Sequence, residues 1–86
     1  MRDYARMVRD KFPEVALRLG RNGDAESLLS RCLELAPGFT SARYNLAIAL
    51  QRQARPAEAR TQIGLALAQD PKNPGYRNLK GAILGR

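Results

Sequence analysis

Several residue types on which enzymes and metal sites depend are absent or scarce in this chain of 86 residues. Histidine, the commonest general base and metal ligand, is missing, and Cys32 is the only cysteine, so no internal disulfide can form. The eight carboxylates are scattered and indicate no paired site, and the glycines fit no phosphate-binding motif. We therefore expect no catalytic residue, no metal, no cofactor and no enzyme activity.

Long apolar runs are also absent, since no stretch approaches the roughly 18 residues that a membrane-spanning helix needs. The opening residues, MRDYARMVRDKF, contain acids and lack the apolar core of a signal peptide, and they do not read as a transit peptide. With a single thiol, the sequence predicts a cytoplasmic protein. An apolar fraction of 44% argues against disorder, and the length predicts one small domain over residues 1–86.

Acidic residues are few: eight Asp and Glu stand against fifteen Lys and Arg, which gives a net charge of +7. Residues 44–86 account for most of the imbalance, with seven basic and two acidic groups. A positive surface favours acidic partners and speeds their encounter. Because twelve of the fifteen basic residues are arginine, a solvated surface encoded by a GC-rich bacterial genome is the alternative explanation.

The chain resembles itself when it is shifted by 34 residues, so that Ala25 falls on Ala59 and Pro37 on Pro71. The matches between them place apolar or small residues at i, i+4, i+7 and i+8, which is one face of a helix. The other aligned pairs are Leu29 with Ile63, Cys32 with Ala66, Leu33 with Leu67, Phe12 with Leu46, Val15 with Ala49, Ala16 with Leu50, Arg43 with Arg77, Ala47 with Gly81, and Leu50 with Leu84. This period predicts stacked helical hairpins that share one core.

Turn residues predict helices over 3–19, 24–36, 40–54, 57–69 and 74–85, with short connections that make neighbours antiparallel and no strands. Asp24 is expected to cap the second helix, and Pro56 to stand in the first turn of the fourth. Pro13 cannot lie inside a regular helix without removing a hydrogen bond. The first helix therefore either kinks near residues 11–12 or ends there, with a new helix beginning at Pro13.

Alanine stands at several positions that the period assigns to the core, and this choice predicts close helix crossings. Small side chains at Ala47, Ala59 and Ala66 let paired helices approach, while leucines and Tyr44 fill the space between hairpins. Cys32 aligns with Ala66, so we expect a buried core thiol rather than a nucleophile, which would need a basic, open setting.

The period, these small residues, the large ones at Tyr44, Leu46, Leu50 and Leu67, and the DP pair at 70–71 resemble the tetratricopeptide repeat family. The resemblance implies an all-α array of antiparallel helix-turn-helix repeats: a degenerate repeat at 6–39, a full one at 40–73, and the first helix of an incomplete third repeat at 74–86. Ala54 departs from the family, because glycine is usual at that turn. The segment NPGYRNLKGAIL is also similar to helices of bacterial proteins in which such repeats are fused to sulfotransferase-like domains, although this chain contains no such enzyme.

The resemblance further implies a protein–protein interaction module, or scaffold, that binds a peptide or helix of a partner in a concave groove of first helices. The implied groove residues are Tyr44, Asn45, Ile48, Gln51 and Arg52 from the central repeat, Asn78 and Ala82 from the last helix, and Asp10 and Glu14 from the first. Asn45 matches an asparagine that bonds the peptide backbone in some members of the family, and an amide both donates and accepts. A solvated or helix-capping amide is the alternative role of Asn45.

One family-specific binding mode, a clamp for the C-terminal carboxylate of chaperone tails, does not fit. Asp10 and Glu14 stand where that clamp has a lysine and an asparagine, and Leu79 and Ile83 stand at its later basic positions. Only Asn45 matches, so we exclude this clamp.

A basic module with weak nonspecific nucleic-acid binding is the alternative function. Its phosphate contacts would come from Arg52, Arg55, Arg60, Lys72, Arg77 and Lys80. Aromatic residues for base stacking are few and mostly fall on core positions, which counts against this reading of the sequence. A membrane surface is not expected either, because no helix sets a basic face against bulky apolar anchors.

The last predicted helix should present an apolar set that no following helix covers completely: Tyr76, Leu79, Ile83 and Leu84. The chain would then be part of a longer array, pair with another copy, or fray at this end. We expect self-association or further repeats through this helix.

Overall fold

The computed structural model describes residues 12–84, which form five α-helices and no β-strand within that range. The helices are α2 (Pro13–Arg18), α3 (Asn22–Leu35), α4 (Thr40–Arg52), α5 (Pro56–Gln69) and α6 (Pro74–Leu84). The prediction of an all-α fold is confirmed. Most of the first predicted helix, including the positions before residue 12, lies outside the described residues.

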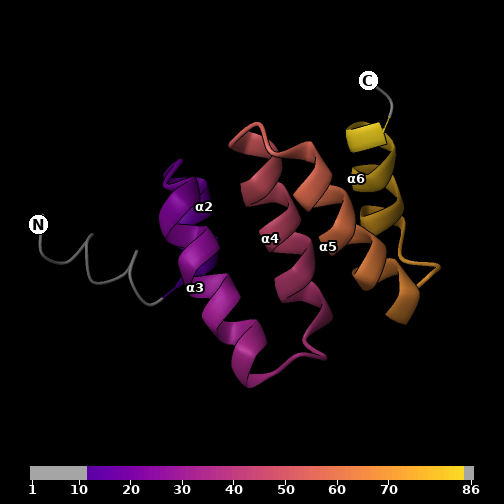
Figure 1. Cartoon of the computed structure of the whole chain (residues 1–86), viewed down its shortest axis with the longest axis horizontal. Coiled ribbons are helices and arrows are strands. Elements are labelled where there is room, and N and C mark those ends of the chain that lie inside the picture. Colours follow the sequence, from indigo (N-terminus) through magenta and orange to yellow (C-terminus); the bar gives the residue numbers. More distant parts are fainter. Residues whose placement is uncertain (1–11, 85–86) are drawn as a thin grey trace, which may run out of the picture.

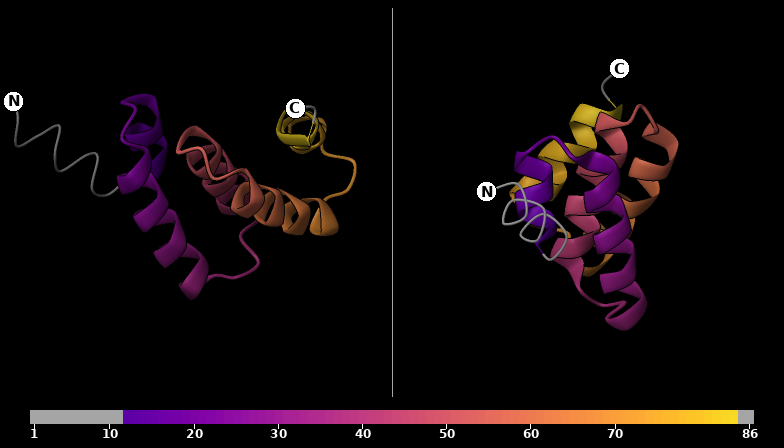
Figure 2. Two further views of the ribbon diagram at one scale, coloured as in Figure 1. Left: turned by 45° about the horizontal axis from the view of Figure 1, so that its top comes forward. Right: turned by 90° about the vertical axis from the view of Figure 1, so that its left-hand side faces the viewer.

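Consecutive helices pack side by side, and the hairpins follow one another along the length of the molecule (Figure 1). α3 packs against α2 and α4, α5 packs against α4 and α6, and α4 also touches α6. Figure 2 shows the same stack from two further sides. Each of the helices α3, α4 and α5 thus has a described helix before and after it, whereas α6 has described neighbours on one side only.

Alanines make up half of the buried core, and they set how closely the helices pack. Ala25, Ala47, Ala59 and Ala66 are each 0% exposed, so the prediction that these small residues face the interior is confirmed. The distance between packed helices depends on the side chains at their contact, and a methyl group permits a closer approach than leucine would. Leucines, Ile63 and the rings between repeats fill the remaining space.

Pro13 begins α2, so a new helix at this residue is the correct one of the two predicted alternatives. Phe12 before it has an extended backbone with φ −125° and ψ 99°, which a continuous kinked helix would not contain. A proline at the first helical position costs no hydrogen bond, because its missing N–H would have no partner within the helix. Pro56 begins α5 in the same way, as predicted.

The turns after α2 and α4 each reverse the chain through one residue in the left-handed region, Gly20 with φ 74° and Ala54 with φ 60°. In both turns the next N–H donates to a carbonyl near the end of the preceding helix, at 2.8 Å after Gly20 and 3.0 Å after Ala54. The predicted helix over 40–54 is therefore too long. It ends at Arg52, because a left-handed residue cannot continue a right-handed helix.

Two local predictions about α3 are corrected by the structure. α3 begins at Asn22, so Asp24 lies in its first turn and Arg21 occupies the N-cap position. The helix starts earlier than predicted because Gly20 has already reversed the chain, and Asp24 still lies where the helix dipole favours an acid. Cys32 packs against the core but is half-buried rather than buried, since its side chain is longer than the aligned alanine and keeps partial contact with solvent.

Candidate functional site

Side-chain contacts join α2, α4 and α6, the helices that the 34-residue period aligns and that we call the first helices. Nη1 of Arg52 on α4 donates to the carbonyl of Leu17 in α2 at 2.9 Å. The rings of Tyr44 on α4 and Tyr76 on α6 lie 5.1 Å apart between centroids, at an angle of 31°. Burial, followed by the charges of Asp70 and Tyr44, raises the pKa of Tyr76 above its ordinary value. These contacts hold the three first helices side by side.

The predicted groove residues that the structure describes lie on α2, α4 and α6. The half-buried members are Tyr44, Asn45, Ile48 and Gln51. The exposed members are Arg52 and Asn78, together with the flanking residues Glu14 and Ala82. Asp10 lies outside the described residues. We call the set Tyr44, Asn45, Ile48, Gln51, Arg52 and Asn78 the first-helix face; its binding role stays a prediction.

Amide side chains differ according to the helix that carries them. Four amides of the turns and second helices form side-chain hydrogen bonds, namely Gln53, Gln62, Gln69 and Asn73, whereas Oδ1 of Asn22 on α3 has no hydrogen-bond partner within the described part of the chain. None of the hydrogen bonds among residues 12–84 uses the side-chain amide of Asn45, Gln51 or Asn78. Asn45 also lies in the middle of α4, so it is not a helix cap. The first-helix amides thus keep donors and acceptors for an external partner or for water.

An ion-pair network ties the turn between α4 and α5 to α3. Oε1 of Glu26 accepts hydrogen bonds from Nη1 of Arg55 at 2.8 Å and from Nε2 of Gln53 at 2.9 Å. Arg55 also pairs with Glu58 at 2.6 Å. Hydrogen bonds with Glu58 and Glu26 raise the pKa of Arg55 above its ordinary value, and the bond from Arg55 lowers the pKa of Glu58. Both carboxylate partners of Arg55 therefore lie within the chain, and its charge is neutralised there.

This network bears on the alternative of nucleic-acid binding. Arg52 is bonded to a backbone carbonyl and Arg55 to two carboxylates, so these two cations are engaged within the chain. The other cations named for phosphate contact are exposed: Arg60, Lys72, Arg77 and Lys80. The positive surface around the central turn is smaller than the sequence indicated.

Within residues 12–84, His, Cys, Asp and Glu side chains form no group of three or more that can hold a metal ion. No helix in this range combines the length and the apolar character needed to cross a membrane. In the same range Oδ1 of Asn22, at the start of α3, is buried without a hydrogen-bond partner.

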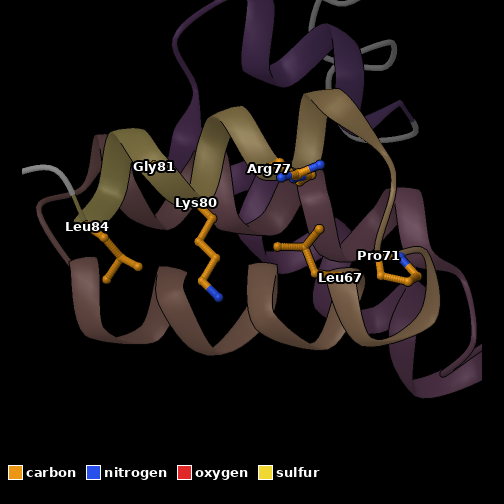
Figure 3. A pocket seen from close by; sticks show the side chains of 6 residues that line it. All are labelled: Leu67, Pro71, Arg77, Lys80, Gly81 and Leu84. Carbon is orange, nitrogen blue, oxygen red and sulfur yellow. The ribbon is translucent and has the colours of Figure 1, made fainter.

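A groove between α5 and α6, with a volume of about 450 Å³, lies outside the first-helix face (Figure 3). Smaller pockets of about 230 and 310 Å³ border α3, α4 and α5. None of these three pockets is lined by a residue of the first-helix face. The α5/α6 groove was not among the predicted sites. One signal for it exists in the 34-residue shift, which aligns the charged Lys80 with Leu46, a residue that is buried in the structure.

Comparison with known proteins agrees with the repeat period and with the hairpin stack. The model of the family described as Tetratricopeptide repeat matches residues 16–83, which is most of the chain and runs from α2 to α6. No curated protein and no solved structure matches the chain. The similarity of residues 73–84 to repeats fused to sulfotransferase-like domains stays a prediction. Because one family model covers nearly all of the described hairpins, the chain belongs to the tetratricopeptide repeat family.

Proposed function

We propose that this chain is a non-catalytic interaction module that binds a peptide or helix of a partner protein along the first-helix face. Proteins of the tetratricopeptide repeat family generally mediate protein–protein interaction, which supports a role in binding another protein. The proposal divides the chain into repeats at 6–39 and 40–73 and a first helix at 74–86. It assigns no catalytic residue, cofactor or metal.

The observation that carries the proposal is the contrast between the two groups of amides. Asn45, Gln51 and Asn78 lie on first helices with no side-chain hydrogen bond among residues 12–84. Four of the amides of turns and second helices are engaged, and Oδ1 of Asn22, which is unpaired among the described residues, is buried. An amide can pair at once with an N–H and a carbonyl of a bound backbone. Ile48 and Tyr44 add half-buried apolar surface beside Asn45.

The charge of the chain favours an acidic partner, because its net charge is +7. We place the protein in the cytoplasm, where the half-buried thiol of Cys32 would stay reduced. Self-association or further repeats through α6 is the alternative use of that helix and stays a prediction. The apolar surface that α6 leaves uncovered is smaller than the sequence indicated, because Tyr76 and Ile83 are already buried within the chain. Leu84 is 49% exposed.

Capture of partners by the immobilised chain, with Asn45→Ala and Arg60→Ala as matched variants, tests this function. Arg60 is an exposed cation on α5, away from the first helices. Partners of the first-helix face should be lost with Asn45→Ala, kept with Arg60→Ala, and should survive nuclease treatment and added salt. Capture that disappears with nuclease, or that Arg60→Ala weakens and Asn45→Ala does not, would identify phosphate-driven binding and overturn the proposal.

A further inference from the structure

The groove between α5 and α6 is lined by two cations and by apolar residues. Figure 3 shows the side chains of both helices and of the turn between them around this space. No carboxylate lines it, and its charged residues are Arg77 and Lys80. The full lining is Leu67, Pro71, Arg77, Lys80, Gly81 and Leu84.

The same groove exists one repeat earlier, and there α5 occupies it apart from two smaller pockets of about 230 and 310 Å³. Shifting the lining by 34 residues gives Leu33, Pro37, Arg43, Leu46, Ala47 and Leu50. These residues belong to α3, α4 and their turn, and α5 packs against α4 at this place. Leu46, Ala47 and Leu50 are accordingly 5%, 0% and 3% exposed. Their counterparts Lys80, Gly81 and Leu84 are all exposed.

The helix that fills the earlier groove shows what an occupant must bring. α5 carries Ala59 and Ile63, both 0% exposed, at positions i and i+4. Between them Oε1 of Gln62 accepts a hydrogen bond from Nη1 of Arg43 at 3.1 Å, while Nη2 of Arg43 donates to the carbonyl of Pro37. Arg77 is the counterpart of Arg43, so the later groove offers the same donor to an acceptor at i+3 of the incoming helix.

The two grooves differ at one aligned position in a way that favours an acidic occupant. Lys80 stands where the earlier groove has Leu46, so a second cation replaces an apolar contact. A carboxylate on the incoming helix would neutralise Arg77 and Lys80, whereas a second copy of this groove related by a two-fold axis would set cations against cations. Complementarity therefore favours an acidic helix over self-pairing.

We propose that the α5/α6 groove docks an amphipathic helix of a partner protein. This helix carries a small residue against Gly81, an apolar residue one turn later, and a carboxylate between them that pairs with Arg77 and Lys80. The proposal concerns a surface separate from the first-helix face and does not depend on it.

A peptide with the sequence of residues 55–71, and the same peptide with Gln62→Glu, are the probes. Both copy the helix that fills the earlier groove, and they differ only in the charge of the acceptor. We expect saturable binding to the full chain by calorimetry or fluorescence anisotropy. The glutamate peptide should bind about 2- to 5-fold more tightly, as one exposed ion pair provides, with the advantage shrinking at high salt.

Gly81 permits a variant that blocks the groove without disturbing the fold. A Cβ atom added there meets no atom within 4 Å outside its own stretch of helix, and glutamine is a better helix former than glycine. Gly81→Gln should abolish peptide binding, and Gly81→Ala, which reproduces Ala47, should retain it. Asn45→Ala should leave peptide binding unchanged, which separates this groove from the first-helix face.

Three outcomes would overturn the proposal. One is the absence of saturable binding of either peptide up to about 1 mM. Another is binding that Gly81→Gln leaves intact, since the peptide would then sit elsewhere. The third is a dimer of the unmodified chain, seen by sedimentation, that Gly81→Gln converts to a monomer, because the occupant would then be a second copy.

Discussion

The 34-residue period aligns α4 with α6, yet the aligned positions meet different surroundings in the two helices. Leu50 is 3% exposed and its counterpart Leu84 is 49% exposed. Ala47 is 0% exposed, while Gly81 lies in contact with solvent. The difference is α5, which covers α4 and has no described counterpart over α6. In a stacked-repeat protein, burial is thus a property of the neighbouring helix as much as of the residue.

The largest expected effect comes from truncating the paired leucines. Leu50→Ala should lower the free energy of unfolding by about 2–5 kcal/mol, because it removes a buried side chain and leaves a cavity. Leu84→Ala should lower it by no more than about 1 kcal/mol, since half of that side chain is already in water. Urea denaturation followed by circular dichroism measures both. Equal losses of unfolding free energy at the two positions would show that α4 and α6 do not differ in how their leucines are covered.

The close crossing of α4 and α5 is tested by enlarging an alanine. Ala59→Leu should cost about 1–3 kcal/mol, since Ala59 is 0% exposed and the added atoms have no space at the crossing. Ala82→Leu, on the exposed side of α6, is the matched control and should be nearly neutral. The measurement is the denaturation midpoint of each variant. A neutral Ala59→Leu would mean that the crossing does not depend on a small residue there.

The two left-handed turns form a second pair to compare. Gly20→Ala should destabilise the chain by about 1–2 kcal/mol, because alanine is strained at positive φ. Ala54→Gly should stabilise it by about 0.5–1 kcal/mol, since the relief of strain exceeds the entropy that glycine adds to the unfolded chain. Thermal melts of the two variants check this. A loss of stability in Ala54→Gly would show that the turn is not strained.

The smallest expected effect is on the acid side of the pH profile. The bond from Arg55 lowers the pKa of Glu58 in the folded chain below its ordinary value of 4.5. A depressed carboxyl pKa stabilises the fold above the ordinary value, and this stabilisation is lost as pH falls through the folded value. Glu58→Gln should therefore lower the melting temperature near neutral pH and show a shallower further decline below about pH 4. Parallel pH profiles for variant and parent would rule out this contribution.

The repeat period was predictable because it depends on residues that mark the face and the end of their own helix. Alanines at a fixed spacing and a proline at each period mark a helix face and its end, as Ala25, Ala59 and Pro71 do. The helix ends were less predictable. Alanine rarely adopts a left-handed conformation, so the sequence did not indicate that α4 ends before Ala54. Asp24 has the chemistry of a cap, but the turn at Gly20 starts α3 before it.

The periodic pattern could not predict side-chain contacts between residues far apart in the sequence. Glu26 meets Arg55 from 29 residues away, and Arg52 reaches Leu17 from 35 residues away, through side-chain geometry that has no period. These contacts remove two arginines from the predicted positive surface. The positions of the first-helix residues on their helices followed from the repeat, whereas the state of their amides required the hydrogen-bond pattern of the folded chain.

The most direct test of the central claim, that the α5/α6 groove is a helix-docking position equivalent to the one that α5 occupies, is to supply a helix there. Placing a copy of residues 51–73 directly after Leu84 continues the 34-residue register and delivers a second α5 to the α5/α6 groove. We predict a higher melting temperature than that of the parent chain, because each added repeat contributes an interface with its neighbour, and we predict no such gain when Gly81→Gln is also present. An unchanged or lower melting temperature of the extended chain would contradict the equivalence of the two grooves.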